Sequence, residues 1–191
     1  MSTKRPAAPG SSAPKPPVSF SSSITISDIA VLIGTQPILI RSYSIIQPRA
    51  RLISTLGPVS IGSMCIISER ASIGVLSAST AAADPKLAGV TIGDNVTVDI
   101  GAIVEASHVG DGTHIEANAR IHAGARIGKF CRIGAFCEVA AGEVLEDYTV
   151  LFGDGLRRID KTENDEAKLK STRRHVEVLR KLVTSKPEKF M

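Results

Sequence analysis

The feature that most constrains this sequence is an aliphatic residue at every sixth position. Eight such residues follow one another without a miss: Val109, Ile115, Ile121, Ile127, Ile133, Val139, Leu145 and Leu151. Shorter runs with the same spacing precede them, so the repeat extends from about residue 24 to residue 153. Neither a helical period nor the alternation of an ordinary strand explains this spacing. It is the period of a hexapeptide β-helix, in which three hexads form one triangular coil.

Two further positions of the hexad agree with this interpretation. Glycine directly follows the aliphatic residue at Gly62, Gly74, Gly93, Gly110, Gly128 and Gly134, where a turn favours a minimal side chain. Small residues stand four positions after it, at Cys65, Ala71, Val96, Ala102, Thr113, Ala119, Ala125, Cys131, Cys137 and Thr149. We therefore expect an all-β fold, a left-handed parallel β-helix over residues 23–156. Its hand is taken from known hexapeptide-repeat proteins, since the usual crossover rule is right-handed.

The segments that lack the repeat define the rest of the organisation. Residues 1–22 form a Pro/Ser-rich tail that we expect to be disordered, because it holds too little apolar surface to fold. Residues 75–89 interrupt the hexads and are expected to leave the solenoid as a loop excursion.

Residues 157–191 are predicted to form a C-terminal helix and tail. Thr162 is a candidate N-cap, and the helix is expected over about residues 163–184, ending before Pro187. Its apolar stripe consists of Leu169, Val176, Leu179 and Val183. The stripe indicates a helix packed along one face of the β-helix, and a partner-binding helix is the alternative.

Charge and composition narrow the function. The net charge of +4 is concentrated at the ends, since residues 21–156 hold nine basic and thirteen acidic side chains. Aromatic residues make up 4% of the chain, so it lacks the basic, aromatic-bearing surface of a nucleic-acid binder.

No apolar run is long enough for membrane insertion or for a secretory signal. The three cysteines, at core positions, are expected to be reduced. We expect a soluble, cytoplasmic protein.

Three histidines raise the possibility of a metal site, because gamma-type carbonic anhydrases bind zinc through three histidines on this architecture. His108 and His114 precede an inward aliphatic residue by one position and His122 follows one, so all three are expected to face outward on different sides. Where those enzymes read approximately G-H-G-A-I-L-H-G, this chain has Ile100 and Glu105 in place of the two histidines. We therefore predict no metal site, since the ligands of one zinc ion must converge.

Hexapeptide acyltransferases are the other enzymatic alternative. They use a general-base histidine beside a coenzyme A groove, and an outward His108, His114 or His122 is a candidate for that role. No accompanying substrate motif is present, and outward polar residues on a solenoid are usually only solvated. The sequence therefore leads us to assign no catalytic, cofactor-binding or metal-binding residue and to expect that the chain is not an enzyme.

Two stretches are more specific than a hexapeptide repeat. Residues 48–73 read PRARLISTLGPVSIGSMCIISERASI, and residues 148–159 read YTVLFGDGLRRI. Both resemble the dynactin subunit 6 family, the first through P-x-A-R-(I/L)-I and G-P-(V/I)-x-I-G, the second through T-V-(I/L)-(Y/F)-G followed by L-R-R. The Pro-rich tail and the short interval between Gly153 and Arg157 depart from that family.

This resemblance implies a structural subunit of the pointed-end complex of dynactin, the activator of dynein. The implied partners are the sibling β-helix protein dynactin subunit 5, dynactin subunit 4 and the pointed-end actin-related protein, with dynein contacted indirectly. It also implies association with the cytoskeleton and a role in cargo or adaptor attachment. These partners follow from the resemblance alone.

Overall fold

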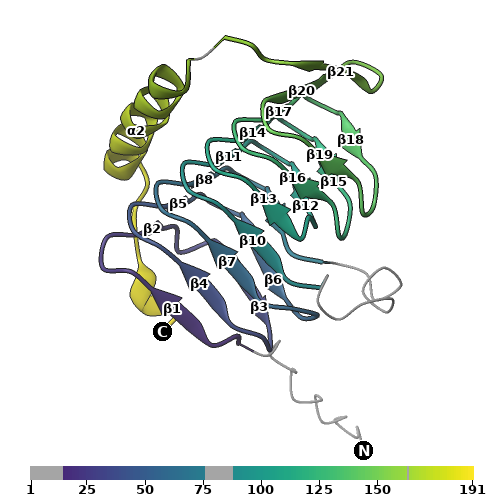
Figure 1. Ribbon diagram of the computed structural model, residues 1–191. Coiled ribbons are helices and arrows are strands. Elements are labelled where there is room, and N and C mark those ends of the chain that lie inside the picture. The colour runs from purple at the N-terminus through teal and green to yellow at the C-terminus, as the bar shows by residue number, and fades with distance from the viewer. Residues whose placement is uncertain (1–14, 76–87, 163) are drawn as a thin grey trace, which may run out of the picture.

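The computed structural model describes residues 15–75, 88–162 and 164–191. Its strands form three parallel sheets that are the sides of a solenoid (Figure 1). The first sheet consists of β1 (Val18–Phe20), β4 (Ile38–Ile40), β7 (Val59–Ile61), β10 (Val90–Ile92), β13 (His108–Val109), β16 (Arg126–Ile127) and β19 (Val144–Leu145). The second consists of β2 (Thr25–Ile26), β5 (Ile45–Ile46), β8 (Ile66–Ile67), β11 (Thr97–Val98), β14 (His114–Ile115), β17 (Arg132–Ile133), β20 (Thr149–Phe152) and β21 (Leu156–Ile159). The third consists of β3 (Val31–Gly34), β6 (Arg51–Ser54), β9 (Ser72–Ile73), β12 (Ile103–Val104), β15 (Arg120–Ile121) and β18 (Glu138–Val139).

The predicted fold class is confirmed. All eight residues of the uninterrupted aliphatic run are buried, and they stack on one another through the pairing of successive strands, as in Val109, Ile127 and Leu145. Burial of each such side chain stabilises the fold by about 1.5–3 kcal/mol, so this column is its main source of stability. All ten small residues of the hexad are buried as well.

The glycines of the repeat have a different role from the one predicted. Gly62, Gly93, Gly110 and Gly128 lie where successive coils approach closely, and none of them has a positive φ. A Cβ atom on Gly110 would lie 2.6 Å from the carbonyl carbon of Gly128. The left-handed backbone conformation occurs two residues later instead, at corner residues such as Phe130 and Tyr148. The glycines therefore permit close stacking of the coils.

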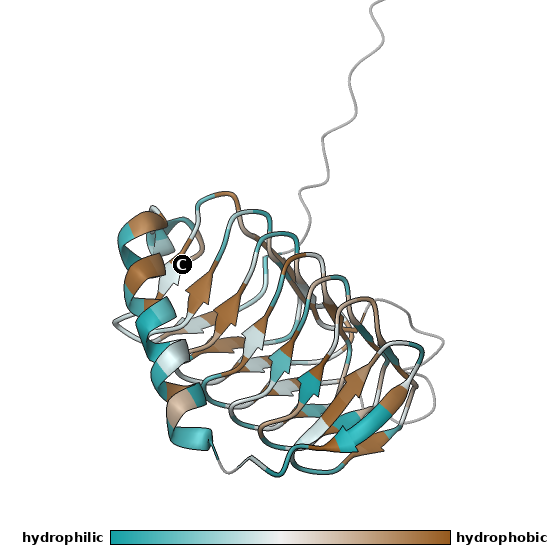
Figure 2. Ribbon diagram, turned by 90° about the horizontal axis from the view of Figure 1, so that it is seen from above, coloured by the Kyte–Doolittle hydropathy of each residue, from teal (hydrophilic) through white to brown (hydrophobic). Residues whose placement is uncertain are grey.

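An α-helix and a short 3-10 helix, η2 (Pro187–Lys189), follow the solenoid. Helix α2 (Asp165–Leu182) runs from the last coil back along the second sheet, and the C-terminus lies near the first coil (Figure 1). Val176 is buried against Ile45 and Ile66, and Leu179 and Val183 pack beside it. The chain is then tied to β2, since the backbone N–H of Lys186 donates to the carbonyl of Ile26 at 2.9 Å. Seen from above, α2 lies along one side of the solenoid (Figure 2).

Several predicted boundaries are corrected by the structure. Val18–Phe20 belongs to the solenoid as β1, although we placed residues 1–22 in the tail. Leu156–Ile159 forms β21, which pairs antiparallel with β20, so residues 157–159 are not part of a helical tail. Thr162 does not cap α2: Asn164 is the N-cap residue, and the Thr162 hydroxyl donates to Asp160 at 2.5 Å.

Other predictions fall on parts of the chain that the structure leaves out. The disorder predicted for the tail concerns residues 1–14 that lie outside the described part of the chain, which begins at Lys15. The loop excursion at 75–89 is also outside them, except for its buried ends at Val75 and Ala88. Among the described helices, none combines the length and apolarity needed to cross a lipid bilayer.

Candidate functional site

The three histidines that raised the metal hypothesis lie on three different sides of the solenoid. His108 is in β13 of the first sheet, His114 is in β14 of the second, and His122 directly follows β15 of the third. His108 pairs with Arg126 and His114 pairs with Arg132 on the next coil. Within residues 15–75, 88–162 and 164–191, no three His, Cys, Asp or Glu side chains are grouped for a metal ion.

Ile100 and Glu105, which stand where the anhydrases have two histidine ligands, also lie in different environments. The Ile100 side chain is 54% exposed, whereas Glu105 is buried. An outward aliphatic side chain and a buried carboxylate on the same coil do not form a ligand set, because zinc ligands converge on one point.

We expect the purified protein to contain no stoichiometric zinc. The physical reason is the separation of His108, His114 and His122 onto three sheets. Elemental analysis of protein prepared without chelators measures this, with a gamma-type carbonic anhydrase purified in parallel as the control. One zinc ion per chain would show that our assignment of these side chains is wrong.

A groove of about 470 Å³ lies between the second sheet and α2, and it is the strongest candidate site in the described part of the chain. Its floor consists of outward side chains of β11, β14, β17 and β20, and α2 and the end of β21 form its walls. The polar side chains that line it are Thr97, Asp99, His114, Arg132, Arg158, Asp160, Lys168, Ser171, Thr172 and His175.

His114 and Asp99 are joined by a hydrogen bond within this groove. The Nε2 atom of His114 lies 2.8 Å from Oδ2 of Asp99, and both side chains are about one-third to two-fifths exposed, at 41% and 34%. A carboxylate only accepts hydrogen bonds, so Nε2 carries the proton and the neutral ring keeps its lone pair on Nδ1. A histidine oriented by a carboxylate is the arrangement of a general base.

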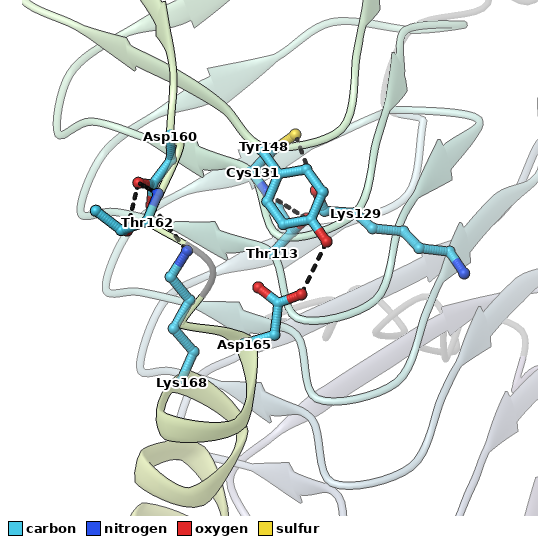
Figure 3. A network of polar contacts seen from close by, with 8 residues as sticks. All are labelled: Thr113, Lys129, Cys131, Tyr148, Asp160, Thr162, Asp165 and Lys168. Atoms are coloured by element: carbon cyan, nitrogen blue, oxygen red, sulfur yellow. Dashed lines mark hydrogen bonds and ion pairs between the residues drawn. The ribbon is translucent and has the colours of Figure 1, made fainter.

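The first turns of α2 are held against the solenoid by polar contacts (Figure 3). The Tyr148 hydroxyl donates to Oδ2 of Asp165 at 2.8 Å, and Lys168 donates to Oδ2 of Asp160 at 2.9 Å. Hydrogen bonds from Thr162 and Lys168 hold the pKa of Asp160 below its usual range. Asp160 is therefore ionised throughout the physiological pH range.

Cys131 lines the same groove but is not a candidate nucleophile. Burial raises the pKa of the Cys131 thiol to about 11, so the reactive thiolate is scarce at neutral pH. Burial likewise raises the pKa of Cys65, to about 12. Both thiols donate weakly to backbone carbonyls, in agreement with their predicted role as small core residues.

The sequence analysis missed the pairing of His114 with Asp99. A repeat of three hexads aligns His114 with a residue eighteen positions away, which does not bring it next to Asp99. Val98 pairs with Ile115, so that coil is only 17 residues long. Asp99 follows one inward residue and His114 precedes the other, which places both side chains on the outer surface of adjacent strands. The sequence did hold a signal for this pair: an outward polar residue stands next to each of two inward residues that pair on adjacent coils.

Comparisons with known proteins agree with the fold. Residues 106–141 match the bacterial transferase hexapeptide (six repeats) family. A hexapeptide transferase family protein from Anaplasma phagocytophilum has a TM-score of 0.71 at 15% identity, over 87% of this chain and 96% of the other. A putative acetyltransferase from Bacillus cereus has a TM-score of 0.69 at 21% identity, over 87% of this chain and 91% of the other. No curated protein matches the sequence.

These comparisons define the chain as a hexapeptide-repeat β-solenoid. At 15% and 21% identity, they establish the shared fold and no particular reaction. They nevertheless contradict our expectation that the chain is not an enzyme, because these two solved structures are described as a hexapeptide transferase family protein and a putative acetyltransferase. The structure adds a histidine paired with a carboxylate in a groove, which the expectation had not taken into account.

Proposed function

We propose that this chain is a subunit of the pointed-end complex of dynactin and binds its neighbours through the last coil of the solenoid. The proposal starts from the resemblance of residues 48–73 and 148–159 to the dynactin subunit 6 family. The second of these stretches corresponds to β20, β21 and the turn between them. The surface of the last coil is therefore the expected binding surface.

An exposed apolar surface on the last coil is the observation that carries the proposal. Five large apolar side chains there are 40–75% exposed: Phe136, Val144, Phe152, Leu156 and Ile159. Three of them belong to the stretch that resembles the dynactin family. Phe152 pairs with Leu156 across β20 and β21, so these two exposed side chains lie side by side on one face of the strands. Large exposed apolar side chains that lie together mark protein–protein interfaces.

The backbone of the last coil supports the same interpretation. β21 is the outermost strand of the second sheet, and within the described residues no strand pairs with its outer edge. Such an edge offers free N–H and C=O groups to a strand from another chain. A sibling β-helix, as in dynactin subunit 5, presents strands of matching spacing. This surface would join the chain to dynactin subunit 4 and the pointed-end actin-related protein within a cytoskeleton-associated assembly.

Affinity purification of the tagged full chain from native cytosol, followed by mass determination of the complex, tests this proposal. We expect recovery of actin-related filament and dynein components. Leu156→Asp should reduce that recovery at least tenfold, because it adds a charge to the apolar surface. Val178→Asp is the control, since Val178 is 54% exposed on α2, away from the last coil. Recovery of the chain as a homotrimer that binds coenzyme A would contradict the proposal.

Acyl transfer is the second candidate function, and the pairing of His114 with Asp99 favours it. In this function, Nδ1 of His114 would take the proton from the amine or hydroxyl group of the acceptor as it attacks the thioester carbonyl of acyl-coenzyme A. The C–S bond would break, the coenzyme A thiolate would leave with that proton, and Asp99 would position the ring. A coenzyme A-dependent transfer assay with His114→Asn measures it. Loss of at least a hundredfold in rate, with an unchanged melting temperature, would favour this function.

A further inference from the structure

The groove under α2 contains more cationic than anionic side chains. Arg132, Arg158 and Lys168 come from three different elements, β17, β21 and α2. The groove contains two carboxylates, and both are already engaged: Asp99 with His114, and Asp160 with Lys168.

Of the three cationic side chains, Arg158 is the one available to bind a ligand. Arg132 is held by Glu116, whose Oε1 lies 2.5 Å from its Nε atom. Lys168 is held by Asp160. No acidic side chain in the described part of the chain forms an ion pair with Arg158, whereas the adjacent Arg157 binds Glu143 at 2.6 Å. The guanidinium of Arg158 is therefore available at the edge of the groove.

The groove is preformed, because α2 is attached to the solenoid at both ends. Close to its N-terminus, the bonds from Tyr148 to Asp165 and from Lys168 to Asp160 fix its position (Figure 3). Towards its C-terminus, Val176 is buried on Ile45 and Ile66. The volume of about 470 Å³ between these attachments is within the range of small-molecule sites.

We propose that this groove binds a small molecule that carries a phosphate group. Arg158 and Arg132 would provide N–H donors in the planar arrangement that matches phosphate oxygens. The hydroxyl of Ser171 lies on the wall formed by α2 and offers a further donor, whereas the Thr172 hydroxyl donates to the carbonyl of Lys168 at 3.3 Å. Arg158, which has no acidic partner among the described residues, favours an anionic ligand over a cation, and an apolar ligand would leave the polar lining unpaired.

This inference does not depend on the proposed assembly, although the groove and the last-coil surface share strand β21 through Arg158. All lining residues belong to a single chain, so the site needs no second subunit. A failure of the pull-down would leave the binding of phosphate unaffected, and the reverse also holds.

Isothermal titration of the full chain with inorganic pyrophosphate at low ionic strength tests the inference. We expect saturable 1:1 binding that Arg158→Gln weakens at least tenfold. Arg120→Gln is the matched control, because Arg120 is an exposed arginine of β15 on the third sheet, and it should leave the affinity within twofold. Melting curves of both variants show whether they remain folded.

Three results would overturn the inference. One is the absence of saturable heat with the unmodified chain. Another is an equal loss of affinity in Arg158→Gln and Arg120→Gln, which would show that pyrophosphate responds only to the overall charge. The last is binding of citrate with no binding of pyrophosphate, which would assign the groove to carboxylates.

Discussion

Ile127→Asp should unfold the solenoid at room temperature. Ile127 is 1% exposed and is stacked between Val109 on one coil and Leu145 on the next. An aspartate there would place an unpaired charge in an aliphatic column, where burial of a charge without a partner is strongly unfavourable. We expect a loss above about 4 kcal/mol, comparable with the whole free energy of unfolding of many small domains. Ile121→Asp should have the same effect from the third sheet.

Arg126→Ala is the control for this prediction. Arg126 precedes Ile127 in β16 and is exposed, so its side chain lies on the outer surface of the same strand. Its removal should change the free energy of unfolding by no more than about 0.5 kcal/mol. Thermal melts followed by circular dichroism measure all three variants. If the three melted alike, the assignment of inward and outward positions would be wrong.

Gly110→Val should destabilise the fold by about 3 kcal/mol, a typical cost of overpacking. A Cβ atom on Gly110 would lie 2.6 Å from two backbone atoms, the carbonyl carbon of Gly128 and the nitrogen of Lys129. Backbone of the next coil cannot move aside without breaking the pairing of β13 with β16. For a chain of this size, such a loss lowers the melting temperature by about 6–12 °C.

Ala140→Val is the matched control for the glycine variant. Ala140 directly follows the inward Val139, so it occupies the same position of the hexad, but it is exposed. We expect its free energy of unfolding to stay within about 0.5 kcal/mol of the parent chain. Equal destabilisation in the two variants would mean that β-branching, and not the close approach of the coils, is responsible.

The side chains that face the interior of the solenoid were predictable from the sequence. An aliphatic residue at every sixth position and a small residue four positions later identified side chains that the structure buries, down to Cys65 and Cys131. This succeeded because a solenoid repeats its local environment: each coil packs only on its neighbours, so one rule applies along the whole run. The helical stripe of Val176, Leu179 and Val183 was identified from a different period, the 3.6 residues per turn of an amphipathic helix.

Which outward side chains become neighbours was less predictable, because the alignment of adjacent coils depends on the length of each coil. Ile46 pairs with Ile67, Val98 with Ile115 and Ile115 with Ile133, so coils of 21, 17 and 18 residues occur in one chain. A fixed repeat of eighteen therefore misaligns outward neighbours, and Asp99 was not matched with His114. Strand β21 was missed because it pairs antiparallel after the hexads end.

The sequence by itself determined which residues face the interior, since the removal of aliphatic side chains from water follows from their spacing alone. Only the tertiary structure decided that α2 lies over β14 and β17 and encloses a groove with His114, Asp99 and Arg158. These residues lie up to 59 positions apart, between Asp99 and Arg158. Their meeting depends on where the chain turns back after the last coil, and the contacts that hold it there, such as Tyr148 with Asp165, have no periodic signal in the sequence.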